Sequence, residues 1–162
     1  MVFLVIIMAL FLSTTKNKMD SKSRVSVPSS FRSTLSKQNF KGIIAFPSYS
    51  NKCIDSCGID RMEALAESLD QNDNYSKDEF DLMSLYFGEA EKLPFDREGR
   101  IILPKNLIKH SGILDQVLFV GLGPTFQIWE PETYNNQKNK TIQKAQEKNL
   151  NPRLKPIPRG IR

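Results

Sequence analysis

A nine-residue phrase occurs twice in this chain, and its repetition limits the fold more than any other feature. Residues 20–28 read Asp-Ser-Lys-Ser-Arg-Val-Ser-Val-Pro, and residues 96–104, 76 positions later, read Asp-Arg-Glu-Gly-Arg-Ile-Ile-Leu-Pro. Asp, Arg and Pro keep identical offsets, and apolar residues follow the Arg in both copies. Two copies are too few for a solenoid, so the repeat predicts two related half-domains that pack together.

Each copy of the phrase predicts a turn that leads into a short strand. An Asp carboxylate accepts hydrogen bonds from backbone amides two or three residues later, and an Arg at the strand entrance is placed to pair with it. We therefore expect the ion pairs Asp20–Arg24 and Asp96–Arg100. A single pair of this kind is usually an ordinary surface ion pair of little energetic consequence, but its duplication in the same context favours a functional role.

The similarity between the copies continues beyond the phrase. After each Pro comes a segment of helical character, followed by two apolar segments of strand character. The second pair of strands is expected to form a hairpin with its turn at Gly121–Pro124. The expected elements are helices over residues 29–35 and 105–110 and strands over residues 42–47, 117–121 and 126–129, with a further strand segment that ends at Cys53-Ile54. Each half is thus predicted to contain a strand, a short helix and two strands.

Two longer helices are predicted between the halves. In the first, apolar residues recur at helical spacing, and the second opens with a capping box from Ser76 to Glu79. The apolar positions are Ile59, Met62, Leu65, Ala66 and Leu69 in the first helix and Phe80, Met83 and Phe87 in the second. We expect these helices either to pack on the strands or to form subunit contacts.

The two phrases, of the form Asp-x-x-x-Arg-(apolar)-x-(apolar)-Pro, resemble the MraZ family of bacterial transcriptional regulators. The closing Phe126-Gln-Ile-Trp129, the segment Leu118-Phe-Val-Gly121 and the intervening Phe87-Gly88 fit the same pattern. The resemblance extends from about Leu12 to Pro131. It is specific, because both motif copies, their spacing and the connecting helices agree.

The resemblance implies an α+β fold, mainly β, with two connecting helices and a C-terminal helix and tail. Each half is implied to be a swapped-hairpin unit of the AbrB type, the two units combining into one β-barrel and the subunits into a ring-shaped homo-oligomer. The implied organisation is an apolar lead over residues 1–11, a first AbrB-like DNA-binding unit over 12–58, a helical connector over 59–89, a second AbrB-like unit over 90–133, and a basic helix and flexible tail over 134–162.

The resemblance also implies a function. Family members bind short direct repeats upstream of the bacterial division and cell-wall gene cluster, so we expect a sequence-specific transcriptional regulator that is cytoplasmic and associated with the nucleoid. Its expected partners are double-stranded DNA and further copies of the chain, without a membrane or a small-molecule substrate. The residues expected to contact DNA are Lys18, Asp20, Lys22, Arg24, Arg32, Arg97 and Arg100.

One position departs from the family pattern. The family usually has Gly before the Arg, as at Gly99, whereas the first copy has Ser23. A serine fits this turn if its φ is negative or if the strain is modest. Arg24 therefore remains a candidate for DNA contact, with a loop geometry that the sequence leaves open.

Charge is divided unevenly along the chain. Residues 1–41 contain seven Lys or Arg and one acid, residues 42–137 contain eight and sixteen, and residues 138–162 contain eight and one. Phosphate binding requires clustered Lys and Arg, and the first copy meets this need better, through Lys16, Lys18, Lys22, Arg24 and Arg32. We expect the N-terminal half to face DNA, although a generic solvated basic surface has the same composition.

The N-terminal residues 1–12 form an uncharged apolar run. This run is too short for a membrane helix, and it lacks the basic start and the cleavage site of a signal peptide. We expect translation to begin at Met8 rather than at Met1.

The C-terminal region is polar from Pro131 onward. Four lysines fall on an expected helix, namely Lys138, Lys140, Lys144 and Lys148. Residues 151–162 are expected to form a flexible basic tail, which either adds non-specific attraction to DNA or aids solubility.

Residues typical of catalysis or metal binding are few. Cys53 and Cys57 are separated by three residues, and His110 is the single histidine. A structural zinc site needs four ligands, so we expect two reduced thiols, with a disulfide or an intersubunit site as the alternatives. His110 lacks the partners of a nucleophilic triad. We expect no cofactor, no metal site and no enzymatic activity.

A second class of function stays open, that of a protein-binding module such as a toxin-neutralising AbrB-like partner. Such antitoxins usually have one barrel unit and a long disordered tail. The duplication and the short basic tail of this chain favour the regulator. DNA binding that is insensitive to Arg24→Ala would favour the alternative.

Overall fold

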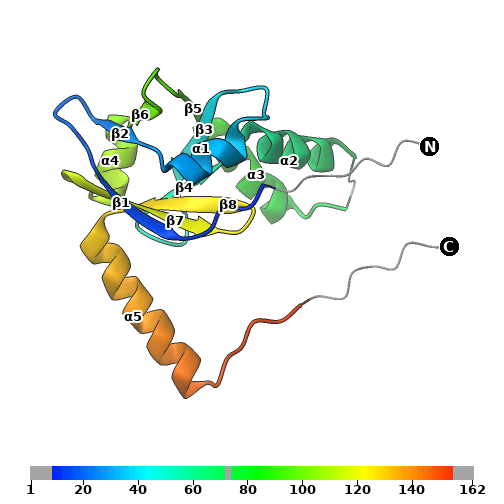
Figure 1. Cartoon of the computed structure of the whole chain (residues 1–162). Helices are drawn as coiled ribbons and strands as arrows, with labels where there is room; N and C mark the ends of the chain where they lie inside the picture. Colours follow the sequence, from blue (N-terminus) through cyan, green and yellow to red (C-terminus); the bar gives the residue numbers. More distant parts are fainter. Residues whose placement is uncertain (1–8, 72–73, 155–162) are drawn as a thin grey trace. The chain divides into compact units, whose positions relative to one another are not determined.

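The two halves predicted from the repeat fold into the same succession of elements. The structure, a computed structural model, describes residues 9–71 and 74–154, so the expected start at Met8 and the end of the tail lie outside the described residues. The first half consists of β1 (Thr14–Lys18), β2 (Arg24–Ser26), α1 (Ser29–Leu35), β3 (Gly42–Pro47) and β4 (Ile54–Cys57). The second consists of β5 (Glu91–Pro94), β6 (Arg100–Ile102), α4 (Lys105–Ser111), β7 (Gln116–Leu122) and β8 (Thr125–Trp129) (Figure 1). Each half therefore has one strand more than the sequence predicted.

Two helices connect the halves, as predicted: α2 (Ile59–Gln71) and α3 (Lys77–Glu89). The predicted capping box at the start of α3 is confirmed. The backbone N of Glu79 donates to Ser76 Oγ at 3.2 Å, and the backbone N of Ser76 donates to Glu79 Oε2 at 2.8 Å. These bonds satisfy amides that the first turn of a helix leaves without partners.

The strands of the two halves are interleaved. Six strands form an antiparallel sheet in the order β1-β7-β8-β4-β3-β5. The first strand of each half pairs with a strand of the other half, β1 with β7 and β5 with β3, and β4 joins β8 in the middle. Strands β2 and β6 pair separately as a two-stranded ribbon, which we call the arginine ribbon. The halves thus exchange strands instead of lying side by side.

The β-barrel expected from the family resemblance is wrong for the described residues. Strands β1 and β5 lie at opposite edges of the sheet with four strands between them, so the sheet stays open. The arginine ribbon, α1 and α4 cover the core in place of a closing strand pair, through Val25, Ile101, Phe31 and Leu107. The fold is mixed α/β, with a mostly antiparallel sheet and five helices in the part of the chain that the structure describes.

Both faces of the sheet are apolar along β3, which explains its unbroken hydrophobic sequence. Ile43 and Ala45 belong to the main core under the arginine ribbon, whereas Ile44 and Phe46 belong to a second cluster that includes Met62 of α2. Successive side chains of a strand point to opposite faces. The main core therefore anchors the ribbon, and the second cluster anchors the helical connector.

Residues from Glu132 onward form a separate compact unit. Helix α5 spans Pro131–Glu147, and it begins earlier than the predicted residue 134 because Pro is well suited to the first helical position. No helix within the described ranges is long and apolar enough to cross a membrane.

Candidate nucleic-acid interface

The two copies of the phrase form two loops with the same hydrogen bonds. In the first loop (Asp20–Arg24), Asp20 Oδ1 accepts from the backbone N of Lys22 and of Arg24, both at 2.9 Å, and Arg24 Nε donates to Asp20 Oδ2 at 2.7 Å. In the second loop (Asp96–Arg100), the corresponding three distances are also 2.9, 2.9 and 2.7 Å. Both predicted ion pairs are confirmed.

These bonds shift the acidity of the paired groups. The hydrogen bond from the backbone of Arg24 is the main cause that lowers the pKa of Asp20, and the backbone of Arg100 lowers the pKa of Asp96 in the same way. The side-chain hydrogen bond to Asp96 raises the pKa of Arg100. Each Asp is therefore held as a carboxylate that orients its Arg.

The residue before each Arg has a left-handed backbone. The φ angle is 61° at Ser23 and 75° at Gly99. A left-handed conformation costs a residue with a side chain about 1–2 kcal/mol, whereas glycine adopts it freely. Of the two ways in which a serine fits this turn, the negative φ is excluded, and the first loop holds Ser23 at positive φ.

The arginine ribbon joins the two loops. The backbone N of Val27 donates to Gly99 O at 3.1 Å, and the backbone N of Leu103 donates to Ser23 O at 2.9 Å. Each loop is therefore tied to the end of the other half's strand. The ribbon therefore carries one loop at each of its two ends.

The ribbon has one buried face and one outer face. Val25 and Ile101 pair at its centre, and both are 1% exposed. The cross-strand pairs Arg24–Ile102 and Ser26–Arg100 flank them, and strand geometry places these four side chains on the opposite face. Ile102 is 62% exposed there. The outer face thus combines two arginines with an exposed apolar side chain.

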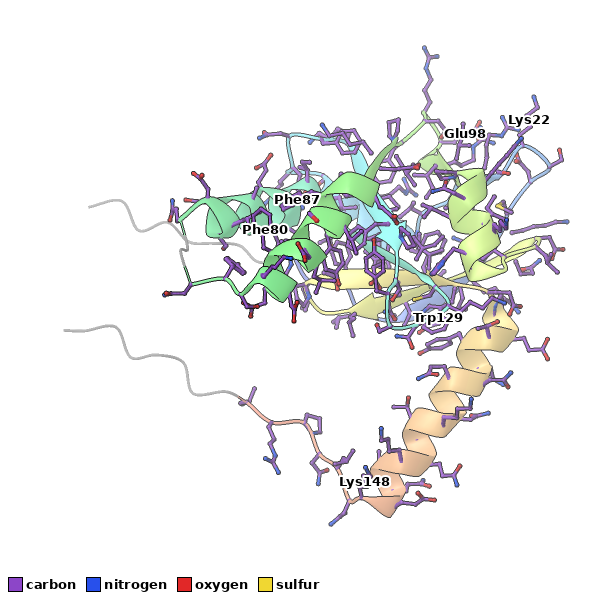
Figure 2. All side chains as sticks on the ribbon, turned by 180° about the vertical axis from the view of Figure 1, so that it is seen from behind. Lys22, Phe80, Phe87, Glu98, Trp129 and Lys148 are labelled. Carbon is purple, nitrogen blue, oxygen red and sulfur yellow. The ribbon has the colours of Figure 1, made fainter. Side chains whose placement is uncertain are left out.

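The tips of the loops differ in charge. Lys22 occupies the first tip, and Glu98 occupies the corresponding place in the second (Figure 2). Glu98 Oε2 lies 3.3 Å from Arg100 Nη1. Within the described ranges, Arg24 has no second acid beside Asp20. The guanidinium of Arg100 therefore pairs with two carboxylates, whereas that of Arg24 pairs with one.

The other candidate residues lie in different settings. Lys18 is exposed at the end of β1 and pairs with Gln116 in the sheet, and Arg97 is exposed in the second loop. Arg32 is half-buried, and its Nε donates to Val27 O at 3.1 Å. A Cβ atom added at Gly99 would lie 2.6 Å from the Arg32 side chain. Arg32 therefore supports the second loop from α1 as well as carrying charge.

Two residues that shape this surface were missing from the sequence prediction. Asn17 Nδ2 donates to Ser26 O at 2.7 Å and so attaches β1 to the ribbon. No local pattern signals this bond, because its partners belong to different strands. Glu98 had a signal, since the repeat aligns it with Lys22.

The cysteines are set apart from the loops. Cys53 and Cys57 are free and buried, and burial raises the pKa of each thiol to about 12. A thiol with so high a pKa is a poor nucleophile. In the described part of the chain, no group of three or more His, Cys, Asp or Glu is placed to hold a metal ion.

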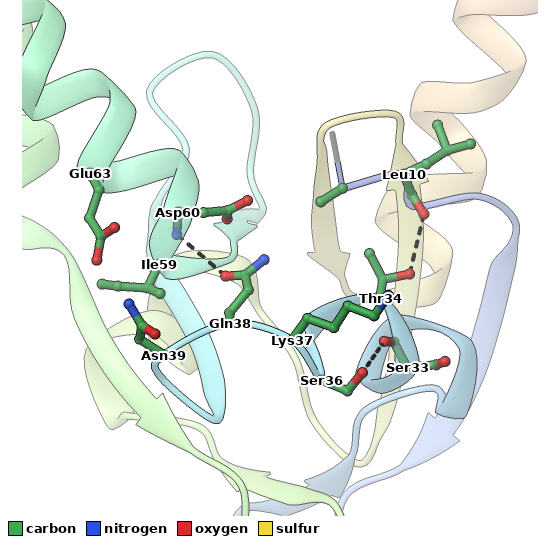
Figure 3. A pocket seen from close by; sticks show the side chains of 11 residues that line it. Leu10, Ser33, Thr34, Ser36, Lys37, Gln38, Asn39, Ile59, Asp60 and Glu63 are labelled. Carbon is green, nitrogen blue, oxygen red and sulfur yellow. Dashed lines mark hydrogen bonds between the residues drawn. The ribbon is translucent and has the colours of Figure 1, made fainter. Parts of the chain in front are cut away.

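The loop residues also lie outside a hollow on the surface. A hollow of about 630 Å³ lies between the end of α1 and the start of α2 (Figure 3). The backbone N of Asp60 donates to Gln38 Oε1 at 3.3 Å, and Thr34 Oγ1 donates to Leu10 O at 3.4 Å. Gln38 thus serves as a cap for α2. None of the residues predicted to bind DNA lines this hollow.

Comparison with known proteins gives consistent matches. The model of the family described as "MraZ protein, putative antitoxin-like" matches residues 86–154, which include the second loop and α5. Proteins named "Transcriptional regulator MraZ" from Rickettsia rickettsii (strain Sheila Smith) and Rickettsia africae (strain ESF-5) are each 46% identical over 143 residues, which are 88% of this chain and 96% of the relative. A protein of the same name from Rickettsia bellii (strain OSU 85-389) is 45% identical over 144 residues, with the same coverage.

Proposed function

The chain belongs to the MraZ family, and from this premise we propose that it regulates transcription by binding double-stranded DNA with the arginine ribbon. The observation that carries the proposal is the pair of Asp–Arg loops that share the same hydrogen bonds and lie at the two ends of that ribbon. A two-stranded β-ribbon fits the major groove of B-DNA. The name of the relatives, transcriptional regulator, agrees with this role.

The first loop is the better reader of bases. Arg24 Nε is bound by Asp20, which orients the guanidinium and leaves its two terminal nitrogens for a guanine edge, the commonest specific contact of Arg. In the second loop Glu98 already occupies Nη1 of Arg100. Lys18 and Lys22 supply phosphate contacts next to Arg24, which position the ribbon without reading sequence.

Ile102 adds an apolar contact between the arginines. It is exposed on the outer face and pairs across the ribbon with Arg24. Apolar side chains in the major groove recognise the methyl group of thymine. We assign Ile102 to this contact, next to the base that Arg24 reads.

The strand exchange supports the duplicated, AbrB-like swapped-hairpin unit that the family resemblance implied. The two first strands cross between the halves, and the two loops are related by the pairing of β2 with β6. In this scheme each half folds by pairing its strands with those of the other half. Arg97 and Arg100 of the second half, and Arg32 of α1 in the first half, serve in this scheme as the weaker DNA contacts.

The helical connector supports self-association. No residue of α3 is buried, and Phe80, Leu82 and Leu85 are 55%, 42% and 45% exposed. A helix with such apolar side chains gains stability when a further subunit covers it. A ring-shaped homo-oligomer built in this way would engage several short direct repeats at once, which raises affinity through effective concentration.

Direct repeats upstream of a division and cell-wall gene cluster are the proposed target, in a cytoplasmic protein associated with the nucleoid. The test is fluorescence anisotropy on DNA from upstream of the protein's own gene and on a scrambled duplex. We expect wild type to prefer the upstream DNA and Arg24→Ala to lose the preference. Equal affinity of wild type for both duplexes would contradict the proposal.

A second function is kept because the matching family model is described as antitoxin-like. A toxin-neutralising protein would use its surface to bind a protein partner, and the arginine ribbon would then serve as a structural element. Wild-type DNA affinity that Arg24→Ala leaves unchanged, together with self-association that persists, would favour this second function.

A further inference from the structure

Helix α5 carries a row of lysines that the two loops do not use. Lys140, Lys144 and Lys148 follow one another at intervals of four residues, so they share one face of the helix, about 6 Å apart along its axis. Lys148 continues the helical turn, since its backbone N donates to Lys144 O at 3.0 Å. We call these three residues the lysine stripe.

The helix does not neutralise its lysine stripe. Exposed polar helices are usually supported by acidic and basic residues four positions apart, but Glu132 and Glu147 are the only acids between residues 131 and 150. Glu147 Oε1 accepts a hydrogen bond from Gln143 Nε2 at 3.0 Å. Among the described residues, no ion pair involves a lysine of the stripe.

The spacing of the stripe is fixed by the helix itself. Pro131 begins α5 and suits the first helical position. The helix ends in a Schellman motif, in which Leu150 N donates to Ala145 O at 2.9 Å, Asn149 N donates to Gln146 O at 3.3 Å, and Asn149 has a φ of 51°. The helix therefore holds three like charges at intervals of four residues, and their repulsion destabilises an isolated helix. A bound polyanion would reduce this repulsion.

The remaining side chains of α5 suit the same partner. Six of them are uncharged amides, namely Asn135, Asn136, Gln137, Asn139, Gln143 and Gln146. Asn and Gln side chains donate hydrogen bonds to phosphate oxygens. No residue of α5 is buried, so the whole stripe is accessible within this unit.

We infer that α5 is a second DNA contact, which binds the phosphate backbone through Lys140, Lys144 and Lys148 and reads no sequence. The stripe is about 12 Å long, and duplex DNA carries one negative charge per about 1.7 Å of its axis. A duplex therefore offers enough phosphates for all three lysines. The inference rests on the proposed function only in taking DNA as the partner, not in the recognition of a sequence.

The test is the salt dependence of binding to a fluorescein-labelled duplex of scrambled sequence. The full chain is compared with Lys140→Gln/Lys144→Gln/Lys148→Gln, in which Gln keeps the helix propensity. The control is Lys37→Gln/Lys52→Gln/Lys77→Gln, which removes the same charge from three exposed lysines outside α5 and both loops.

We expect the stripe variant to lower the slope of log Kobs against log salt by about 2.7, at about 0.9 for each lost phosphate contact, with helical circular dichroism unchanged. We expect the control to change the slope by much less. Equal slope changes in the two variants would overturn the inference. So would a stripe variant that loses affinity for anionic phospholipid vesicles but keeps the wild-type slope on DNA.

The outcome is separable from that of the proposed function. The stripe is judged by the salt slope on scrambled DNA, and the proposed function by the preference for upstream DNA. If wild type shows no preference while the stripe variant lowers the slope, the proposed function fails and the stripe stands. If Arg24→Ala removes the preference while the stripe variant keeps the wild-type slope, the function stands and the stripe fails.

Discussion

The first and second loops have the same backbone frame and opposite charges at their tips. In both, the Asp carboxylate accepts two backbone amides at 2.9 Å and an Arg Nε at 2.7 Å. Lys22 stands at the first tip and Glu98 at the second. The difference teaches that the Asp-x-x-x-Arg pattern specifies a turn, whereas the residues between Asp and Arg set the charge that the turn presents.

The two loops also differ in how easily the turn is made. Gly99 adopts its positive φ without strain, whereas Ser23 does not. The loop that we propose as the reader is therefore the more strained of the two. Strain of this kind persists where the surrounding structure holds it in place, and the hydrogen bond from Leu103 N to Ser23 O does so here.

Exchanging the charges at the loop tips should have the largest effect, which is on the affinity for upstream DNA. We expect Lys22→Glu to weaken binding to upstream DNA about tenfold to a hundredfold, because a phosphate contact is lost and a repulsion is added. Glu98→Lys should strengthen binding, because it frees Arg100 and adds a cation. Fluorescence anisotropy at constant salt measures both affinities. The account fails if neither variant changes the affinity, or if Glu98→Lys alone changes it.

Exchanging the turn residues should change stability by a smaller amount. Ser23→Gly is expected to raise the free energy of unfolding by about 0.5–1 kcal/mol, since it removes the left-handed strain of a side chain. Gly99→Ser is expected to lower it by about 1–2 kcal/mol, because the new side chain is strained and meets Arg32. Urea denaturation measures both, and changes of the same sign would contradict the structural comparison.

Ile102 should contribute a smaller and local effect. Replacing thymine with uracil in the upstream DNA should weaken wild-type binding about fourfold, since burial of one methyl-sized group contributes about 0.8 kcal/mol. The same replacement should have little effect on Ile102→Ala. Leu114→Ala removes another exposed apolar side chain and serves as the control; if it behaves like Ile102→Ala, the thymine contact is excluded.

The smallest effect is expected for the dependence of stability on pH, and the two loops should contribute to it to a similar extent. The pKa values of Asp20 and Asp96 are lowered below their ordinary 3.8 by the backbone hydrogen bonds. The stabilisation is therefore complete above pH 3.8 and is lost as pH falls through the lowered values. Asp20→Asn and Asp96→Asn should each weaken this acid-induced loss to a similar extent in thermal unfolding. If only one of the two variants reduced the acid-induced loss of stability, the hydrogen-bond frames of the two loops would not be equivalent.

Much of the fold could be predicted from the sequence, because its signals are local or repeated. The capping box at Ser76 and the two short helices after the repeated phrases were visible in the residues themselves. The open sheet was not, since its edges at β1 and β5 depend on pairing between strands far apart in sequence. The prediction of a closed barrel came from the family resemblance, and the sheet that the described residues form is open instead.

The candidate site shows the same division. The pairing of Asp20 with Arg24 followed from spacing alone, as did that of Asp96 with Arg100. The bond from Asn17 to Ser26 could not be predicted, because it depends on how β1 approaches the ribbon. The DNA contacts of these residues remain predictions.

The central claim is that two loops of one shape have unequal roles. The most direct test compares Arg24→Ala with Arg100→Ala by anisotropy on upstream and scrambled DNA at one salt concentration. The account predicts that Arg24→Ala loses about tenfold to a hundredfold in preference for the upstream DNA, in line with a lost bidentate base contact, and that Arg100→Ala keeps most of it. Equal losses in the two variants, or a larger loss in Arg100→Ala, would contradict the claim.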